Sequence, residues 1–302
     1  MKKDFVQYLK DIFDESQILI NENMSGHTTF KVGGPAQFYV QPKASQVADV
    51  VRLCVQHGMP YVIIGNGSNL LVGDKGIPGL VIEIGKSMSD IVVTGTHIFA
   101  EAGALLSRVA STAAGHGLAG MEFASGIPGC IGGGTVMNAG AYGGELRQII
   151  TKVHCVDKEG NVCILSNEEC AFDYRYSIIP EKGYLVTGVE LELNPGVEED
   201  IRNKMKELNA QRTEKQPLEY PSAGSTFKRP EGHFAGKLIQ DAGLSGYTVG
   251  GAQVSQKHCG FVVNKGGATA ADIKQLMEEV AAVVQREFGV TLEPEVRFLG
   301  EF

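Results

Sequence analysis

Two glycine-rich segments have the composition of loops that approach an anionic ligand closely. In the first, GNGSN (residues 65–69) follows the short apolar run YVII (61–64). Small residues there let successive backbone N–H groups point at one anion, and Ser68 and Asn69 add side-chain donors. The second, SGIPGCIGGGTVMNAGAYG (125–143), is too long for a single turn and suits a chain that wraps a flat cofactor containing a diphosphate. From the residues alone, ordinary glycine-rich turns explain both segments equally well.

Several familiar catalytic motifs are missing. GNGSNL has Leu70 where the third glycine of a dinucleotide-binding G-x-G-x-x-G would stand, and no clear helix follows it. The triplet GKS (85–87) ends like a P-loop, but Leu80 stands where that motif needs its first glycine. No G-x-S-x-G nucleophile elbow is present, and none of the seven histidines has H-E-x-x-H or Cys/His zinc spacing. The sequence therefore predicts no metal site.

The elements that must position these loops are mixed helices and strands. Hydrophobic periodicity predicts helices near the N-terminus, from Ser45 to Gly58, and over 104–114, 198–212, 234–242 and 269–288. Strands are predicted at 61–64, 80–84, 151–165 and 184–193, in a hairpin around Gly95 and in the last residues of the chain. Ser166 and Glu169 have capping-box spacing, which predicts a short helix. This mixture indicates an α+β fold, with a boundary near Asn194-Pro195-Gly196.

Composition narrows the classes of function. The 302 residues correspond to two or three domains, and 43% hydrophobic with 21% charged residues is ordinary globular usage. The net charge of −8 lowers the odds of a nucleic-acid binder. No stretch is long and apolar enough for a membrane helix, and the N-terminus reads as an amphipathic helix rather than a signal peptide. Six cysteines without a C-x-x-C pair suit a reducing compartment, so we expect a cytoplasmic protein with no nucleic-acid or membrane partner.

Six segments together carry a specific resemblance. They are GNGSNLL (65–71), ASGIPG (124–129), MNAGAYGGE (137–145), YRYS (174–177), PSAGSTFKRP (221–230) and LEPEVRFLG (292–300). In this order, and over nearly the whole chain, the sequence resembles the UDP-N-acetylenolpyruvoylglucosamine reductases (MurB family), flavoenzymes of cell-wall synthesis. Any one segment alone would be a weak signal, but chance agreement of all six is very improbable.

The resemblance implies an α+β fold, with a FAD-binding domain of the p-cresol methylhydroxylase/vanillyl-alcohol oxidase type and a C-terminal α+β substrate-binding domain. We expect an N-terminal helix and lead-in over 1–29, a FAD-binding domain over 30–195 with subdomains of about 30–85 and 86–195, and a substrate domain over 203–302. The cofactor-binding residues implied are Gly65, Asn66, Gly67, Ser68, Asn69, Ser125, Gly126, Ile127, Pro128, Gly129, Asn138, Ala139 and Gly140. Related oxidases often attach flavin through a histidine in the first loop; Asn66 and the absence of His or Cys there predict dissociable FAD.

The implied reaction is the reduction of UDP-N-acetylenolpyruvoylglucosamine to UDP-N-acetylmuramate in peptidoglycan precursor synthesis. NADPH reduces FAD, and hydride then passes to the enolpyruvyl vinyl carbon, which pushes charge onto the adjacent carbon and the carboxylate. Ser225 matches the family's proton donor, Arg175 a catalytic arginine and Glu295 a catalytic glutamate. Glu295 would either be protonated and stabilise the developing negative charge, or orient Arg175 or a water molecule. Without the resemblance, these three would be a turn serine, a surface arginine and a solvent-facing strand residue. Because they belong to different predicted domains, we expect the site at the domain interface.

The substrate brings two phosphates and a carboxylate, so cationic side chains are expected around it. Lys215 matches a family lysine that faces the substrate, and the further candidates are Tyr174, Lys228, Arg229 and His258. An alternative interpretation of Lys228 and Arg229 is a solvated pair of basic residues without a binding role. For His258 the alternative is a structural role, which is more common for a lone histidine. No room exists between Arg175 and Lys215 for the substrate-covering loop of the family's longer form, so the chain resembles the shorter form.

Two other functions remain open. A flavin-dependent oxidase of the same fold, acting on an alcohol or sugar, would lack the AGSTF serine and the E-P-E-V-R glutamate. A non-catalytic flavin- or nucleotide-binding module would bind FAD but leave it oxidised when NADPH and substrate are added.

Overall fold

The computed structural model describes the chain from Lys2 to Phe302, with side chains described from Phe5 onward. Met1, the first residue of the predicted lead-in, lies outside the described residues. Contacts within the chain divide it into two units. Unit 1 consists of the chain up to Ile20, Phe38–Asn66 and Gly79–Arg212, and unit 2 consists of Asn21–Gln37, Gly67–Pro78 and Thr213–Phe302. Both units are thus discontinuous in sequence, whereas the predicted domains are contiguous ranges.

A four-stranded sheet carries the first glycine loop. Its strand order is β1 (Ile18–Asn23), β2 (Pro35–Val40), β5 (Ile77–Glu83) and β3 (Tyr61–Ile64), and the unit boundaries fall within β1, β2 and β5. β3 and β5 are parallel, and β3 ends directly before Gly65. In unit 1, α1 (Lys2–Lys10) and α2 (Val47–Gln56) bury their apolar faces in the core, as their periodicity predicts.

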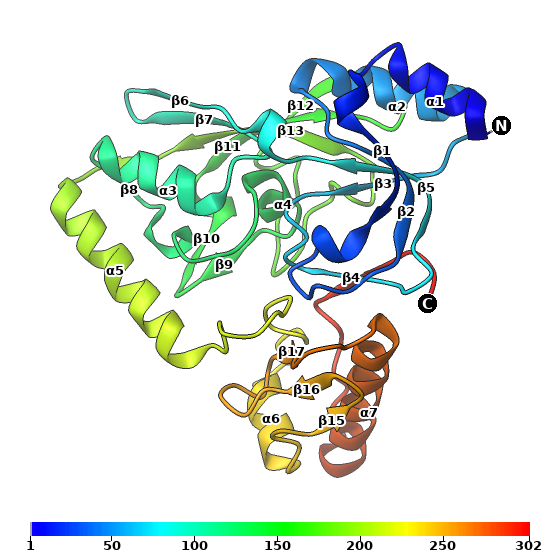
Figure 1. Ribbon diagram of the computed structural model, residues 1–302. Helices are drawn as coiled ribbons and strands as arrows, with labels where there is room; N and C mark the ends of the chain where they lie inside the picture. Colours follow the sequence, from blue (N-terminus) through cyan, green and yellow to red (C-terminus); the bar gives the residue numbers. More distant parts are fainter. Residues whose placement is uncertain (1) are drawn as a thin grey trace. The chain divides into compact units, whose positions relative to one another are not determined.

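The larger sheet of unit 1 is antiparallel, with the order β12-β11-β13-β7-β6 (Figure 1). Its strands are β6 (Ile91–Thr94), β7 (His97–Glu101), β11 (Ile150–Val156), β12 (Val162–Ser166) and β13 (Leu185–Glu192). α3 (Leu106–Gly115) packs on β6, and α4 (Ile131–Val136), inside the second glycine segment, packs on β7 and β13. The hairpin predicted around Gly95 is confirmed by β6 and β7.

Short elements complete unit 1. Two small pairs are antiparallel: β9 (Gly140–Ala141) with β10 (Gly144–Glu145), and β8 (Leu118–Ala119) with β14 (Asn194–Pro195). The long helix α5 (Glu198–Lys215) follows, and the boundary between the units falls within its last turn, after Arg212. In the described residues of both units, the 3-10 turns are Glu15–Gln17, Met24–Gly26, Ala44–Gln46, Lys86–Met88, Glu122–Ala124 and Leu146–Gln148.

Unit 2 contains a small antiparallel sheet, with one helix packed on the sheet and a second helix packed on the first (Figure 1). The sheet has the order β15 (Thr248–Val249), β16 (Ala252–Val254) and β17 (Val262–Asn264), and the helices are α6 (Ala235–Asp241) and α7 (Ala270–Phe288). Thr269 caps α7, the Asp74 carboxylate accepts its first two N–H groups at 2.8 and 2.9 Å, and Gly289 ends it with φ 70°. β18 (Arg297–Leu299) runs parallel to β4 (Leu70–Val72).

The short helix predicted at Ser166 is wrong. Both capping-box hydrogen bonds form, with Ser166 N–H donating to Glu169 and Glu169 N–H to the Ser166 hydroxyl. The segment nevertheless makes only a turn, because Ala171 adopts φ 46° and reverses the chain before a second helical turn begins. Over residues 2–302, none of the helices is long and apolar enough to cross a membrane.

Candidate active site

The first glycine loop is fixed in unit 1 by contact with the second glycine segment. A Cβ atom on Gly65 would lie 2.5 Å from the Cys130 sulfur, so only glycine fits there. Burial raises the pKa of the Cys130 thiol, although N–H groups of Gly133 and Asn66 directed at the sulfur act in the opposite direction. Cys130 is therefore an inert packing thiol that holds the start of the loop.

In unit 2 the same loop is joined to the segment that carries Glu295. Gly67 has φ 63°, and a Cβ atom there would lie 1.9 Å from the His27 carbonyl oxygen. The Asn69 side-chain amide donates to the Glu295 carbonyl at 3.0 Å, and the Asn69 carbonyl accepts from Arg297 N–H at 3.0 Å. Asn69 is thus joined to the segment that carries Glu295 both by its side chain and by its backbone carbonyl.

The loop at 125–129 lies against the end of α5. Ser125 is buried, and its hydroxyl donates to the Glu122 carbonyl at 2.9 Å. A Cβ atom on Gly126 would lie 2.3 Å from the Asn209 side-chain oxygen and 3.1 Å from Arg212 Cδ. This glycine therefore allows the arginine to approach the loop closely.

Arg212 and Arg297 are two functional candidates that the sequence reasoning missed. Burial lowers the pKa of the Arg212 guanidinium, with a smaller opposing effect of Tyr142, and burial also lowers the pKa of Arg297. No ion pair within the described part of the chain involves either side chain. Arg212 is half-buried, and an arginine that is partly removed from water without an acidic partner fits a site that receives an anionic ligand. Arg297 is exposed on β18, so it is a candidate by its charge rather than by desolvation. Sequence gives no signal for this property, because desolvation is a consequence of tertiary packing.

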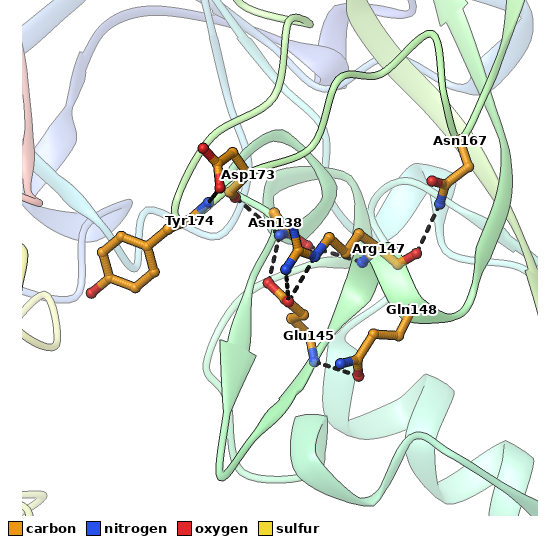
Figure 2. A network of polar contacts seen from close by, with 7 residues as sticks. All are labelled: Asn138, Glu145, Arg147, Gln148, Asn167, Asp173 and Tyr174. Atoms are coloured by element: carbon orange, nitrogen blue, oxygen red, sulfur yellow. Dashed lines mark hydrogen bonds and ion pairs between the residues drawn. The ribbon is translucent and has the colours of Figure 1, made fainter.

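The third predicted cofactor segment, 138–140, packs against the turn that carries Arg175 (Figure 2). Asn138 is fully buried with φ 42°, and its side-chain nitrogen donates to Glu145 Oε2 at 2.8 Å and to the Asp173 carbonyl at 3.0 Å. Arg175 donates from its guanidinium to the Gly140 carbonyl at 3.1 Å. The structure therefore brings Arg175 to this segment and occupies the Asn138 side chain internally.

Ser225 and Glu295 lie on neighbouring segments of unit 2. The Glu295 N–H donates to the Thr226 carbonyl at 2.9 Å, and Phe227 bridges to Pro294. Thr226 is buried, and its hydroxyl accepts from Val262 N–H, which anchors the segment to β17. Ser225 itself is exposed. A hydroxyl and a carboxyl group are thus supported by the same pair of strand-like segments, while Arg175 belongs to unit 1.

The predicted substrate residues have varied surroundings. Lys215 is exposed at the end of α5, and Tyr174 is exposed with the Arg175 guanidinium 5.2 Å from its ring centroid. Lys228 pairs with Glu293 at 3.2 Å, and the Arg229 guanidinium lies 3.9 Å from the Phe234 ring centroid. These two cations therefore have partners within the protein.

His258 is held by its own loop. Its Nδ1 accepts from the Gly260 N–H at 3.1 Å, and its ring packs edge-on to Phe261. Burial lowers the pKa of His258, against a smaller effect of a backbone hydrogen bond, so the imidazole is neutral at pH 7. A neutral ring bonded to its own loop is a weaker candidate for an anionic substrate than Lys215.

Comparisons with known proteins cover both units. A model described as the UDP-N-acetylenolpyruvoylglucosamine reductase C-terminal domain matches residues 216–299, and a model described as a FAD binding domain matches residues 35–166. A UDP-N-acetylenolpyruvoylglucosamine reductase from Agathobacter rectalis is 52% identical, with 100% of both chains covered. The protein of the same name from Caldanaerobacter subterraneus subsp. tengcongensis is 50% identical over 100% of both chains.

Solved structures show the same relationship. The crystal structure of UDP-N-acetylenolpyruvylglucosamine reductase (MurB) from Thermus caldophilus has a TM-score of 0.81 and 35% identity, and covers 93% of this chain and 98% of that chain. An alkyldihydroxyacetonephosphate synthase, with a TM-score of 0.51 and 14% identity over 64% of this chain and 40% of that chain, shares the fold alone. The predicted α+β fold, with its FAD-binding and reductase C-terminal domains, is confirmed by these matches.

Proposed function

This chain belongs to the UDP-N-acetylenolpyruvoylglucosamine reductase family, and we propose that it catalyses the NADPH-driven, FAD-dependent reduction of UDP-N-acetylenolpyruvoylglucosamine to UDP-N-acetylmuramate. The observation that carries this proposal is 52% identity to a reductase over the full length of both chains. The reaction supplies a precursor of peptidoglycan. The six cysteines are free in the described chain, which supports a reducing compartment, and we include the cytoplasm in the proposal.

The residues of unit 1 fit non-covalent FAD. FAD, when bound, supplies the hydride-transfer chemistry that amino-acid side chains lack. Gly65 and Gly126 stand where a side chain would collide with the protein, so the absence of a side chain lets both loops pack closely in unit 1. Arg212, desolvated and without an acidic partner in the described chain, would neutralise a phosphate of the cofactor. The domain division at 30–195 and 203–302 stays part of the proposal, and the two matched ranges support it.

Three side chains are proposed to act on the substrate. The Arg175 guanidinium binds the enolpyruvyl carboxylate and stabilises the negative charge that grows there when hydride arrives. The Ser225 hydroxyl gives its proton to the adjacent carbon, because a carbanion is far more basic than a serine alkoxide. Glu295 stands on the segment beside Ser225 and acts as a hydrogen-bonding partner in that step. Lys215, Tyr174 and Arg297 are proposed to hold the anionic remainder of the substrate.

A titration with both substrates tests the function. We expect purified protein, reconstituted with FAD if necessary, to show flavin absorbance that acid or heat releases. Anaerobic NADPH should bleach this absorbance, and UDP-N-acetylenolpyruvoylglucosamine should restore it with formation of one equivalent of product. Protein that cannot be reconstituted with FAD would contradict the proposal, and so would flavin that NADPH leaves oxidised.

A substitution on α5 tests the fit to FAD. We expect Arg212→Gln to raise the FAD dissociation constant about 10- to 100-fold, because a charge-assisted hydrogen bond contributes roughly 1.5–3 kcal/mol. Flavin titration of the apoprotein by calorimetry measures this. Arg202→Gln is the matched control, since Arg202 lies on the same helix but is exposed and pairs with Glu198 at 2.7 Å. Equal FAD affinity of the two variants would show that Arg212 does not contact the cofactor.

A further inference from the structure

Arg175 projects from a tight turn whose backbone is held in an uncommon conformation. Asp173 and Tyr176 exchange two backbone hydrogen bonds, each of 3.1 Å, and Arg175 between them has φ 53°. A residue other than glycine keeps a left-handed conformation only where its surroundings hold it. The direction of the guanidinium therefore depends on the contacts that fix this turn.

Three contacts join the turn to the 136–140 segment. The Asn138 side-chain nitrogen donates to the Asp173 carbonyl at 3.0 Å, the Arg175 guanidinium donates to the Gly140 carbonyl at 3.1 Å, and the Ser177 hydroxyl donates to the Val136 carbonyl at 2.7 Å. Of these three contacts, only that of Asn138 is made to a backbone atom of the turn, the Asp173 carbonyl. The other two are made by side chains of Arg175 and Ser177. The Asn138 contact does not involve the Arg175 side chain.

The orientation of the Asn138 amide is itself determined by its neighbours (Figure 2). Its oxygen accepts from Arg147 N–H at 2.9 Å, and its nitrogen donates to Glu145 Oε2 at 2.8 Å as well as to Asp173. Arg147 Nε donates in turn to Glu145 Oε1 at 2.7 Å, which fixes that carboxylate. Both amide protons are thus used, and the residue is fully buried. Tyr174, by contrast, points away from this group in Figure 2.

We propose that Asn138 is a positioning residue for Arg175: its amide holds the Asp173 carbonyl and so fixes the turn from which the guanidinium reaches the substrate. Glu145 and Arg147 support it by fixing the amide. The inference rests on the proposed function, in which Arg175 binds the substrate carboxylate. The Asn138 side chain has no donor left for the cofactor-binding role that the resemblance implies for this residue.

Asn138→Asp tests the inference, because it keeps the shape of the side chain and removes the donor to Asp173. We expect FAD affinity and the rate of flavin reduction by NADPH to stay near the wild-type values. Reoxidation by UDP-N-acetylenolpyruvoylglucosamine should be about 10- to 100-fold slower, the scale expected when a catalytic group is displaced by about 1 Å. Calorimetry should show weaker binding of this substrate to the oxidised enzyme.

Two further variants separate positioning from folding. In Asn138→Asp the new carboxylate faces Glu145, so adding Glu145→Gln should recover melting temperature by removing the like-charge contact. The donor to Asp173 is still missing in this double variant, so reoxidation should stay slow. Asn167→Asp is the matched control: its side-chain nitrogen donates to the Arg147 and Ile150 carbonyls at 2.8 and 2.7 Å and does not contact the turn. It should lower the melting temperature and leave reoxidation at the wild-type rate.

The outcomes distinguish the inference from the proposed function. If substrate does not reoxidise the wild-type flavin, the proposed function fails, and this inference fails with it. If wild type is reoxidised and Asn138→Asp reacts equally fast, the positioning role alone is overturned. Recovery of rate together with melting temperature in the Glu145→Gln double variant would also overturn it. In an Arg175→Lys background, Asn138→Asp should cost much less rate than in wild type, because both changes act through the same guanidinium.

Discussion

Ser225→Ala should leave the reduction of FAD by NADPH nearly intact and slow reoxidation by UDP-N-acetylenolpyruvoylglucosamine about 10²- to 10⁴-fold, the range that a positioned proton donor contributes. The physical reason is that NADPH oxidation involves no proton from this hydroxyl, whereas the substrate carbon must be protonated before product forms. Ser225 is exposed, so the substitution leaves no buried polar group without a partner. Anaerobic stopped-flow absorbance measures the two half-reactions separately.

Ser222→Ala is the control for this change, because Ser222 lies three residues earlier in the same loop. It should react like the wild type in both half-reactions. An equal loss in both half-reactions of Ser225→Ala would argue for distortion of the protein and against a role as donor. Product formed in deuterated buffer should carry solvent deuterium at the carbon next to the carboxylate, because the proton that reaches this carbon comes from an exchangeable hydroxyl.

The elements that the sequence predicts well are those whose signals are local. For α7, the apolar stripe Ile273, Leu276, Met277, Val280 and Val284 is buried, and Gly289 ends the helix in the left-handed conformation. Phe288, at the end of the helix, has the spacing of this stripe but is 41% exposed. Periodicity, capping residues and helix-ending glycines depend on neighbours in sequence, so one chain is enough to recognise them.

Pairings between distant segments could not be predicted in this way. β4 and β18 are parallel neighbours although Leu70 and Arg297 lie far apart in sequence. Asp74 accepts a hydrogen bond from the first N–H group of α7, although the two residues lie 196 positions apart in sequence. Such contacts assign 67–78 to unit 2, whereas hydrophobic patterning alone gives each segment to the domain that surrounds it in sequence.

For the site, the residue types were predictable and their partners were not. The glycine loops and the segments with Arg175, Ser225 and Glu295 stand out in the sequence. Asn138, by contrast, belongs to a glycine segment that resembles a cofactor loop, but its amide is used inside the protein. Its partners Glu145 and Asp173 lie 7 and 35 residues away in sequence. Only the fold shows that these two residues take both N–H groups of the Asn138 amide.

Arg175→Lys should slow reoxidation by substrate about 10²- to 10³-fold, the loss typical when one donor to a developing oxyanion is removed. Lysine keeps the positive charge but lacks the planar pair of N–H groups that bind a carboxylate bidentately. The left-handed backbone at this position, with φ 53°, is equally unfavourable for either residue, so the change adds no backbone strain. Flavin reduction by NADPH and FAD affinity should stay at the wild-type values, because neither needs the enolpyruvyl carboxylate.

Arg108→Lys is the control for the arginine change, since Arg108 is exposed on α3 and its guanidinium donates to Ser89. It should behave as the wild type in both half-reactions. If Arg175→Lys reacted within about twofold of wild type, a point charge would suffice at this position, which would contradict bidentate binding of the carboxylate. A slow reaction with unchanged substrate affinity would instead place the guanidinium's contribution in the transition state alone, because an interaction made equally before and during hydride transfer raises affinity without raising the rate.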